Sequence, residues 1–218
     1  MNQLNNQLIS QNVSMVYGIV LQAIFFYIGG TYFGIMFAIN FFVQMMAIIA
    51  TFGCLFGFMT AVNDTGRNIT LNGLAVAMGI MSSPLIRSVD SEIILLSSIS
   101  TLLIFTGFSA IAHFIKDETI TVFGGFLSGL LSVLIVSGFI MLFMNQSDNT
   151  IIAYLLVGLI IFCGYIAYDT KLMYQRFREG QSDHYHHALN LFLDLINIFT
   201  KIVRLLKILS DKKKKTNN

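Results

Sequence analysis

The chain has 218 residues, of which 56% are apolar and 11% are charged, and its mean hydropathy is +0.75. A soluble domain carries about a quarter charged residues. No Lys, Arg, Asp or Glu precedes Asp64. This composition excludes a disordered chain, a secreted disulfide scaffold and a nucleic-acid-binding protein. It predicts an integral membrane protein that spans the lipid bilayer several times.

Seven stretches are long enough to cross the hydrocarbon core, which takes about 20 apolar residues per helix. The first six are nearly free of charge, whereas the seventh carries Asp194, Lys201 and Arg204. In chain order the predicted helices are 14–34, 36–62, 70–87, 92–115, 120–144, 150–172 and 186–209. We therefore expect an all-α transmembrane domain over 14–209, with a polar N-terminal tail (1–13) and a lysine-rich tail (210–218).

Glycines at helix-packing spacing occur in the fifth predicted helix. Gly125 and Gly129 form a GxxxG pair, which is typical of helices whose backbones approach closely in a membrane. We expect this pair to contact a neighbouring helix inside the bundle.

Loop charges indicate the orientation of the helices. With a cytosolic N-terminus, the cytosolic loops would hold five cations, whereas the opposite loops would hold only Arg87. The five are Arg67, Lys116, Lys171, Arg176 and Arg178. A seventh full span would export the four lysines 212–215, so we expect a cytosolic tail and a last segment that enters the bundle and returns.

The seventh helix carries one polar stripe on an otherwise apolar surface. Its members recur at spacings of three and four, which places them on one face of an α-helix. They are His187, Asn190, Asp194, Asn197, Lys201 and Arg204. Such a helix either turns its stripe toward the bundle interior, as a pore-lining surface, or lies flat on the membrane surface. Asp169, in the sixth helix, favours the interior position.

Asp169 and Asp194 are 25 positions apart, and their midpoint lies within the polar, Gly-containing turn 178–183. Two antiparallel helices joined by that turn would bring both carboxyl groups to one depth. Close carboxyl groups in a poorly solvated site share a proton and titrate as a pair. When both ionise, they offer hard oxygen ligands to Ca²⁺. A hydrogen bond that only clasps the two helices is the structural alternative.

The sequence around these acids resembles the Bax inhibitor family. The segments that carry the resemblance are GYIAYDT (164–170), DHY (183–185) and HALNLFLD (187–194), and the lysine-rich tail is similar to that of the eukaryotic, endoplasmic-reticulum members. The resemblance implies a seven-helix bundle with the last helix at its centre. It also implies a pH-sensitive Ca²⁺ leak channel of the endoplasmic reticulum that suppresses cell death.

The family's paired aspartates correspond to Asp169 and Asp194, and Arg67 is the nearest candidate for the basic latch on that pair. Asn190 stands where eukaryotic members often carry a further acid, so a Ca²⁺-capable oxygen is kept without the charge. The implied pore-lining residues are His187, Asn197 and Lys201. The resemblance implies no enzymatic activity and no cofactor. Its expected partners are Ca²⁺ as the transported ion, protons, the lipid bilayer and cell-death regulatory membrane proteins.

Three other functions stay open at this point. A Ca²⁺/H⁺ exchanger would use the same two acids, alternating between proton and cation. An intramembrane hydrolase could be built from Ser109, Asp169 and the four histidines, His113, His184, His186 and His187. The spacing of the last three does not place them on one helical face as an HExxH motif would, which argues against the hydrolase. A protein that acts only through partner proteins would need no ion path.

Overall fold

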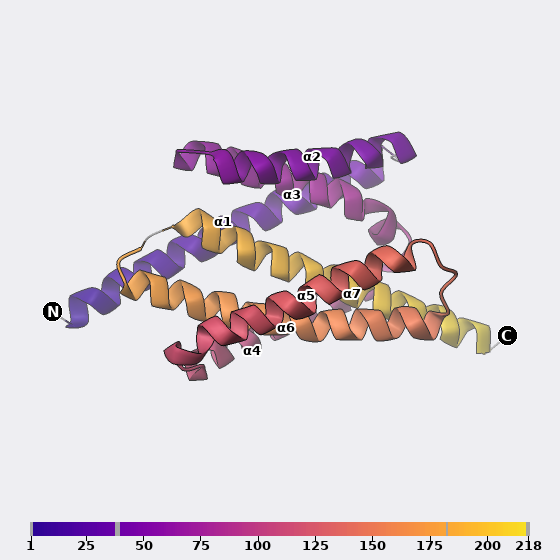
Figure 1. Ribbon diagram of the computed structural model, residues 1–218. Coiled ribbons are helices and arrows are strands. Elements are labelled where there is room, and N and C mark those ends of the chain that lie inside the picture. The colour runs from indigo at the N-terminus through magenta and orange to yellow at the C-terminus, as the bar shows by residue number, and fades with distance from the viewer. Residues whose placement is uncertain (1, 38–39, 182, 217–218) are drawn as a thin grey trace. The chain divides into compact units, whose positions relative to one another are not determined.

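The computed structural model describes residues 2–37, 40–181 and 183–216, and the chain is helical almost throughout these ranges (Figure 1). The expected all-α fold with seven helices is confirmed. The helices are α1 (Asn2–Met36), α2 (Phe41–Thr60), α3 (Asp64–Arg87), α4 (Ser91–Ile111), α5 (Ile120–Met141), α6 (Asp148–Arg178) and α7 (His184–Thr216). Two short 3₁₀ turns, η1 (Ala112–Phe114) and η2 (Asp117–Thr119), connect α4 to α5.

Six of these helices, α1 to α6, are long and apolar enough to cross a membrane. The helices extend beyond the expected apolar runs at several ends. The polar residues 2–13 belong to α1, and α7 continues through lysines 212–215 to Thr216. Helix α3 begins six residues earlier than expected, because the Asn63 side chain accepts the Gly66 N–H at 2.8 Å and caps the helix.

The helices form two compact units. The first contains α1, α2, α3, the last residues of α6 and the start of α7 (177–192). The second contains α4, α5, most of α6 and α7 from residue 193 onward. Both α6 and α7 therefore contribute to both units.

In the first unit, α3 packs against both α1 and α2 (Figure 1). The backbones of α1 and α3 touch at two glycines. A Cβ on Gly79 would collide with the Tyr27 carbonyl oxygen, and a Cβ on Gly30 would collide with the Val76 carbonyl. Only glycine fits such a crossing. Helices in lipid gain no hydrophobic free energy from associating, so the van der Waals contacts of this close approach stabilise the pair instead.

In the second unit, glycines on α5 and α6 make room for side chains of the facing helix. The Tyr168 ring lies over Gly124, the Tyr154 hydroxyl over Gly138 and the Leu127 side chain over Gly164. The contact expected at Gly125 and Gly129 was wrong, because no described atom lies within 4 Å of where their Cβ atoms would stand. The rotation of α5 turns Gly124 toward α6 and these two glycines away from it.

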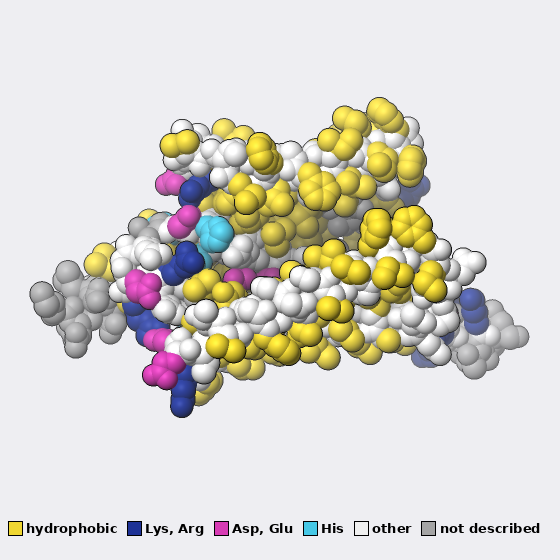
Figure 2. All heavy atoms as spheres, viewed as in Figure 1, with side chains coloured by type: hydrophobic (Ala, Val, Ile, Leu, Met, Phe, Trp, Pro, Cys, Tyr) yellow, Lys and Arg dark blue, Asp and Glu magenta, His cyan; other side chains and the backbone are white. Residues whose placement is uncertain are grey.

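The outer faces of several helices are strongly apolar, and Figure 2 shows hydrophobic side chains spread along α2 and α5. Phe41 on α2 is 78% exposed and Val122 on α5 is 77% exposed, and many other large apolar side chains are similarly open. Apolar surface this continuous would aggregate in water and matches the hydrocarbon of a bilayer. The chain is thus a multi-pass integral membrane protein.

The crossing of α1 and α3 generates a stability prediction. We expect Gly79→Ala to lower the free energy of unfolding by about 1–3 kcal/mol, because the added methyl group meets a backbone carbonyl that cannot rotate away. Gly29→Ala is the matched control, since nothing described lies within 4 Å of its Cβ position. Thermal unfolding of both variants in detergent measures the effect. Equal changes in the two variants would contradict the close contact.

Candidate functional site

The turn between α6 and α7 sets the register of these two helices. Gly180 adopts a positive φ of 81°, a conformation that favours glycine, and its N–H bonds the Phe177 carbonyl at 3.2 Å. Asp183 starts the next helix, because its Oδ1 accepts the His186 N–H at 3.1 Å. Ser182, also part of the expected turn, lies outside the described residues.

Further along the same two helices, in the second unit, Asp169 of α6 and Asp194 of α7 are joined by a side-chain hydrogen bond. Both residues are buried, with 6% and 5% of their surface exposed. A carboxylate has no hydrogen to donate, so a bond between two carboxyl groups requires a proton on one of them. Among the described residues, Asp194 Oδ2 is buried and has no hydrogen-bond partner. The arrangement is one that can hold a shared proton between the two groups.

The residues near Asp169 join that part of α6 to the end of α4 and to the segment between α4 and α5. Lys171 is buried, and its Nζ lies 2.8 Å from Asp117 Oδ1 in η2. The Thr170 hydroxyl donates to Ser109 Oγ on α4 at 3.4 Å, and the centres of the Tyr174 and His113 rings are 5.0 Å apart. These contacts anchor α6 on the side of the acid that leads to the turn. Sequence reasoning missed the Lys171–Asp117 pair, since only the fold brings the two residues together.

On the C-terminal side of Asp194, the polar stripe of α7 runs along α6. We call the contact between α6 and residues 193–216 of α7 the seam. Asn197 Nδ2 donates to the Leu193 carbonyl of its own helix at 2.9 Å. Lys201 Nζ lies 5.5 Å from the Tyr154 ring centre and 5.2 Å from the Phe162 ring centre. The sequence predicted a polar stripe here but gave no sign of these aromatic neighbours.

The other predicted site residues lie in the first unit. His187 is 2% exposed and its ring stands edge-on to Phe177, with ring centres 5.4 Å apart. Asn190 is one helical turn before Asp194 on α7. Arg67 Nη1 lies 2.7 Å from Asp183 Oδ1, so the acid that it contacts is at the start of α7. The roles of Arg67 as a latch and of His187, Asn197 and Lys201 as pore-lining residues stay predictions.

The histidines considered for a hydrolase are occupied with other contacts. His184 Nε2 lies 3.1 Å from Asn12 Oδ1, and the His184 ring packs against Phe177. Within the described ranges, no group of three or more His, Cys, Asp or Glu side chains could hold a metal ion. The two carboxyl groups could therefore meet a cation only with help from amide, carbonyl or water oxygens.

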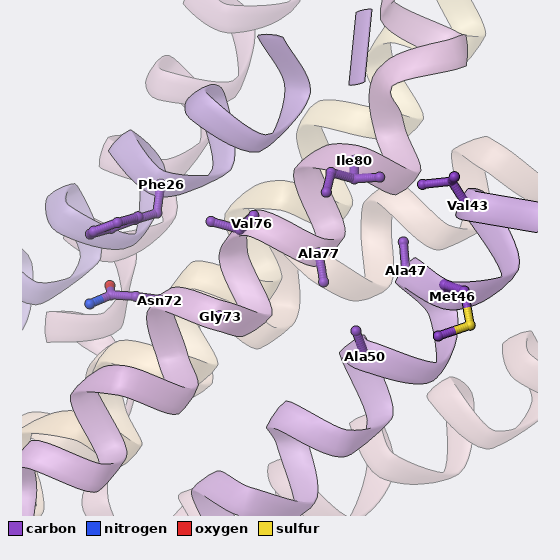
Figure 3. A pocket seen from close by; sticks show the side chains of 10 residues that line it. All are labelled: Phe26, Val43, Met46, Ala47, Ala50, Asn72, Gly73, Val76, Ala77 and Ile80. Atoms are coloured by element: carbon purple, nitrogen blue, oxygen red, sulfur yellow. The ribbon is translucent and has the colours of Figure 1, made fainter. Parts of the chain in front are cut away.

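A cavity of about 480 Å³ opens among α1, α2 and α3 in the first unit (Figure 3). Apolar and small side chains make up nearly all of its lining, and Asn72 is the one polar residue. The lining comprises Phe26, Val43, Met46, Ala47, Ala50, Asn72, Gly73, Val76, Ala77 and Ile80. None of these residues is titratable or nucleophilic, so the cavity offers no proton or cation chemistry.

Comparison with known proteins places the site in context. Residues 9–211 match the family described as "Inhibitor of apoptosis-promoting Bax1". A Paralichthys olivaceus protein named "Probable Bax inhibitor 1" is 31% identical over 181 residues, which cover 78% of this chain and 74% of the relative. The human "Bax inhibitor 1" is 31% identical over 148 residues, which cover 66% of this chain and 62% of the relative. The rice "Bax inhibitor 1" is 29% identical over 187 residues, which cover 84% of this chain and 75% of the relative. The chain thus spans less than two thirds of the length of the human relative.

The electrostatics of Asp183 set the pH range of its ion pair. Partial burial raises the pKa of Asp183, but the His186 N–H bond and the Arg67 guanidinium more than offset burial, so the pKa lies below its usual range. A carboxyl group with a lowered folded-state pKa stabilises the fold above its unfolded pKa of about 3.9. That contribution is lost as the pH falls through the lowered pKa.

We therefore expect Asp183→Asn to lower the free energy of unfolding by about 0.5–1 kcal/mol at pH 7, a value already reduced for solvent screening. The difference from the native protein should shrink below about pH 4. Unfolding in detergent between pH 3 and 7 measures it, and Arg67→Gln should follow the same curve. A difference that does not change with pH would mean that the ion pair contributes nothing to stability.

Proposed function

The chain belongs to the Bax inhibitor family, and we propose that it is a pH-sensitive Ca²⁺ leak channel of the endoplasmic reticulum that suppresses cell death. The observation that carries this proposal is the hydrogen bond between the buried carboxyl groups of Asp169 and Asp194. Ionisable side chains are rare in membrane segments, and those that occur mark ion or proton pathways. Two that share a proton are suited to sense pH.

In this proposal α7 lies at the centre of the seven-helix bundle, and the ion path follows the seam. The shared proton holds α6 and α7 together at the cytosolic end of the path, so the path is closed. Losing the proton leaves two anions that repel each other, and gaining a second replaces a charge-assisted hydrogen bond by a weaker neutral one. Either change loosens the contact between Asp169 and Asp194 and opens the seam.

The open pair would also bind the passing cation. Two ionised carboxylates, with the amide oxygen of Asn190 one turn away, offer Ca²⁺ the hard oxygen ligands that it prefers. Arg67 would act as the latch from its place beside Asp183, by neutralising charge near the start of α7. His187, Asn197 and Lys201 would line the path on either side of the aspartates.

The proposed setting follows from the loop charges and from the family. In this proposal the N-terminus lies in the cytosol, in line with the excess of cations on the cytosolic loops. Helix α7 is continuous, and at its end Lys212 Nζ lies 2.7 Å from Asn149 Oδ1 and Lys214 Nζ lies 3.5 Å from Asp90 Oδ2. Because Asn149 and Asp90 lie at the loops opposite the cytosolic ones, we propose that the lysine-rich tail lies on that side, in place of the cytosolic tail expected from the charges alone. Cell-death regulatory membrane proteins are the proposed partners, and no reaction is catalysed.

A Ca²⁺/H⁺ exchanger is the second candidate, and the shared proton is the observation that favours it. The same acids would then release a proton each time they bind Ca²⁺ and would couple the two fluxes. An imposed proton gradient separates the candidates, because it drives Ca²⁺ uphill in an exchanger but only changes the rate of downhill flux in a leak channel.

The aspartate pair generates the functional prediction. In proteoliposomes of the purified protein, we expect Ca²⁺ efflux to depend on pH, and we expect Asp194→Asn to flatten that dependence. The substitution keeps the size of the side chain and some of its hydrogen bonding but removes its titration. Asp169→Asn should flatten the profile as well. The double variant should add little, because the two groups titrate as one unit.

Asp211→Asn is the matched control, since it makes the same change at an exposed position of the same helix. Its pH profile should equal that of the native protein. Additive effects of the two site substitutions, or an unchanged profile in either, would mean that the pair only clasps the helices and that the gate lies elsewhere.

A further inference from the structure

Lys201 occupies a groove that α6 forms for it at the seam. Tyr154, Gly158 and Phe162 are spaced four residues apart and share one face of α6. The two rings lie beside the ammonium group, with Nζ 5.5 Å and 5.2 Å from their centres. Between them Gly158 leaves room for the lysine stem, because a Cβ there would stand 2.7 Å from Lys201 Cε. The fit combines cation–π attraction with packing of the stem.

This position is an expensive one for a charge. Phe162 lies at the middle of α6, a helix long enough to span the bilayer, so in the proposed channel the ammonium group stands far from both ends of the span. Within the described ranges Lys201 has no ion pair, and the closest charge on its own helix, Arg204, repels it. A Leu or Met would pack between the rings without a charge, so packing alone does not explain a lysine.

The neighbours along the stripe leave the charge uncompensated. Asn197, which lies between Asp194 and Lys201 on α7, gives its amide hydrogen to the Leu193 carbonyl. Lys201 follows Asp194 by seven residues, which is about 10 Å along a helix. A cation that passed the aspartate pair and followed the seam would next meet this fixed positive charge.

We propose that Lys201 closes the seam at a second point and acts there as an electrostatic barrier to cations, above all to divalent ones. The proposal rests on the proposed function, in which the ion path follows this seam. The repulsion grows with the charge of the ion, so Ca²⁺ feels it twice as strongly as K⁺ at the same distance. Ca²⁺ passes only when the ammonium group leaves the Tyr154 and Phe162 rings. Lys201 is thus a selectivity-determining residue, distinct from the titrating pair.

The test compares Ca²⁺ and K⁺ fluxes through the full chain in proteoliposomes at one pH. Lys201→Met keeps the length of the stem and removes the charge, and Lys201→Gln is a second neutral variant. We expect both to raise Ca²⁺ flux by about tenfold or more, the order expected for relieving close-range repulsion, and to raise K⁺ flux less. Lys201→Arg keeps the positive charge, so its Ca²⁺ flux should stay below that of both neutral variants. Lys213→Met, at an exposed position of α7, should leave both fluxes unchanged.

Each outcome decides the proposal. Higher Ca²⁺ flux in the neutral variants, with a smaller rise for K⁺, supports the barrier even if the native protein conducts little. If the native protein conducts Ca²⁺ and the neutral variants conduct no more, the barrier is refuted while the proposed channel stands. If none of the proteins conducts, both the barrier and the channel are refuted. An equal rise for Ca²⁺, K⁺ and an uncharged solute would also refute the barrier, because it would mean that the seam has come apart.

Discussion

The proposed function depends on one interaction, the hydrogen bond between the buried carboxyl groups of Asp169 and Asp194. A lone ionised carboxylate in this buried position would cost on the order of several kcal/mol, because burial removes the water that would solvate its charge. The facing carboxyl group removes that cost by accepting or donating one hydrogen bond. The same bond fixes the register of α6 and α7, since a shift of one residue on either helix would turn an acid toward apolar side chains.

Charge is distributed along the seam in a definite order. The acids lie toward the turn that joins the two helices, and Lys201 lies near the middle of α6, two helical turns further along α7. The Lys171–Asp117 ion pair holds α6 at the acid end, and the Tyr154 and Phe162 rings hold the lysine. An ion path along this seam would therefore contain the aspartate pair, which responds to pH, and Lys201, which responds to the charge of the ion. A substitution at one of these two places leaves the other unchanged.

The sequence predicted the helices and the aspartate contact because both follow from periodicities along the chain. A hairpin centred on one turn aligns residues equally distant from it, which brings Asp169 opposite Asp194 and Phe162 opposite Lys201. The contacts that were missed depend on how each helix is rotated about its axis. A GxxxG spacing does not say which glycine faces a neighbour, and α5 presents Gly124 in place of Gly125 and Gly129. The contact of Arg67 with Asp183 joins residues far apart in the chain, and no local pattern indicates it.

Infrared spectroscopy of the purified protein at pH 7 tests the shared proton most directly, because a protonated carboxyl group has a carbonyl stretching band that a carboxylate lacks. The account predicts such a band in the native protein and in Asp211→Asn, and its loss or shift in both Asp169→Asn and Asp194→Asn. A native spectrum without the band, or identical spectra in all four proteins, would show that no proton is shared between Asp169 and Asp194.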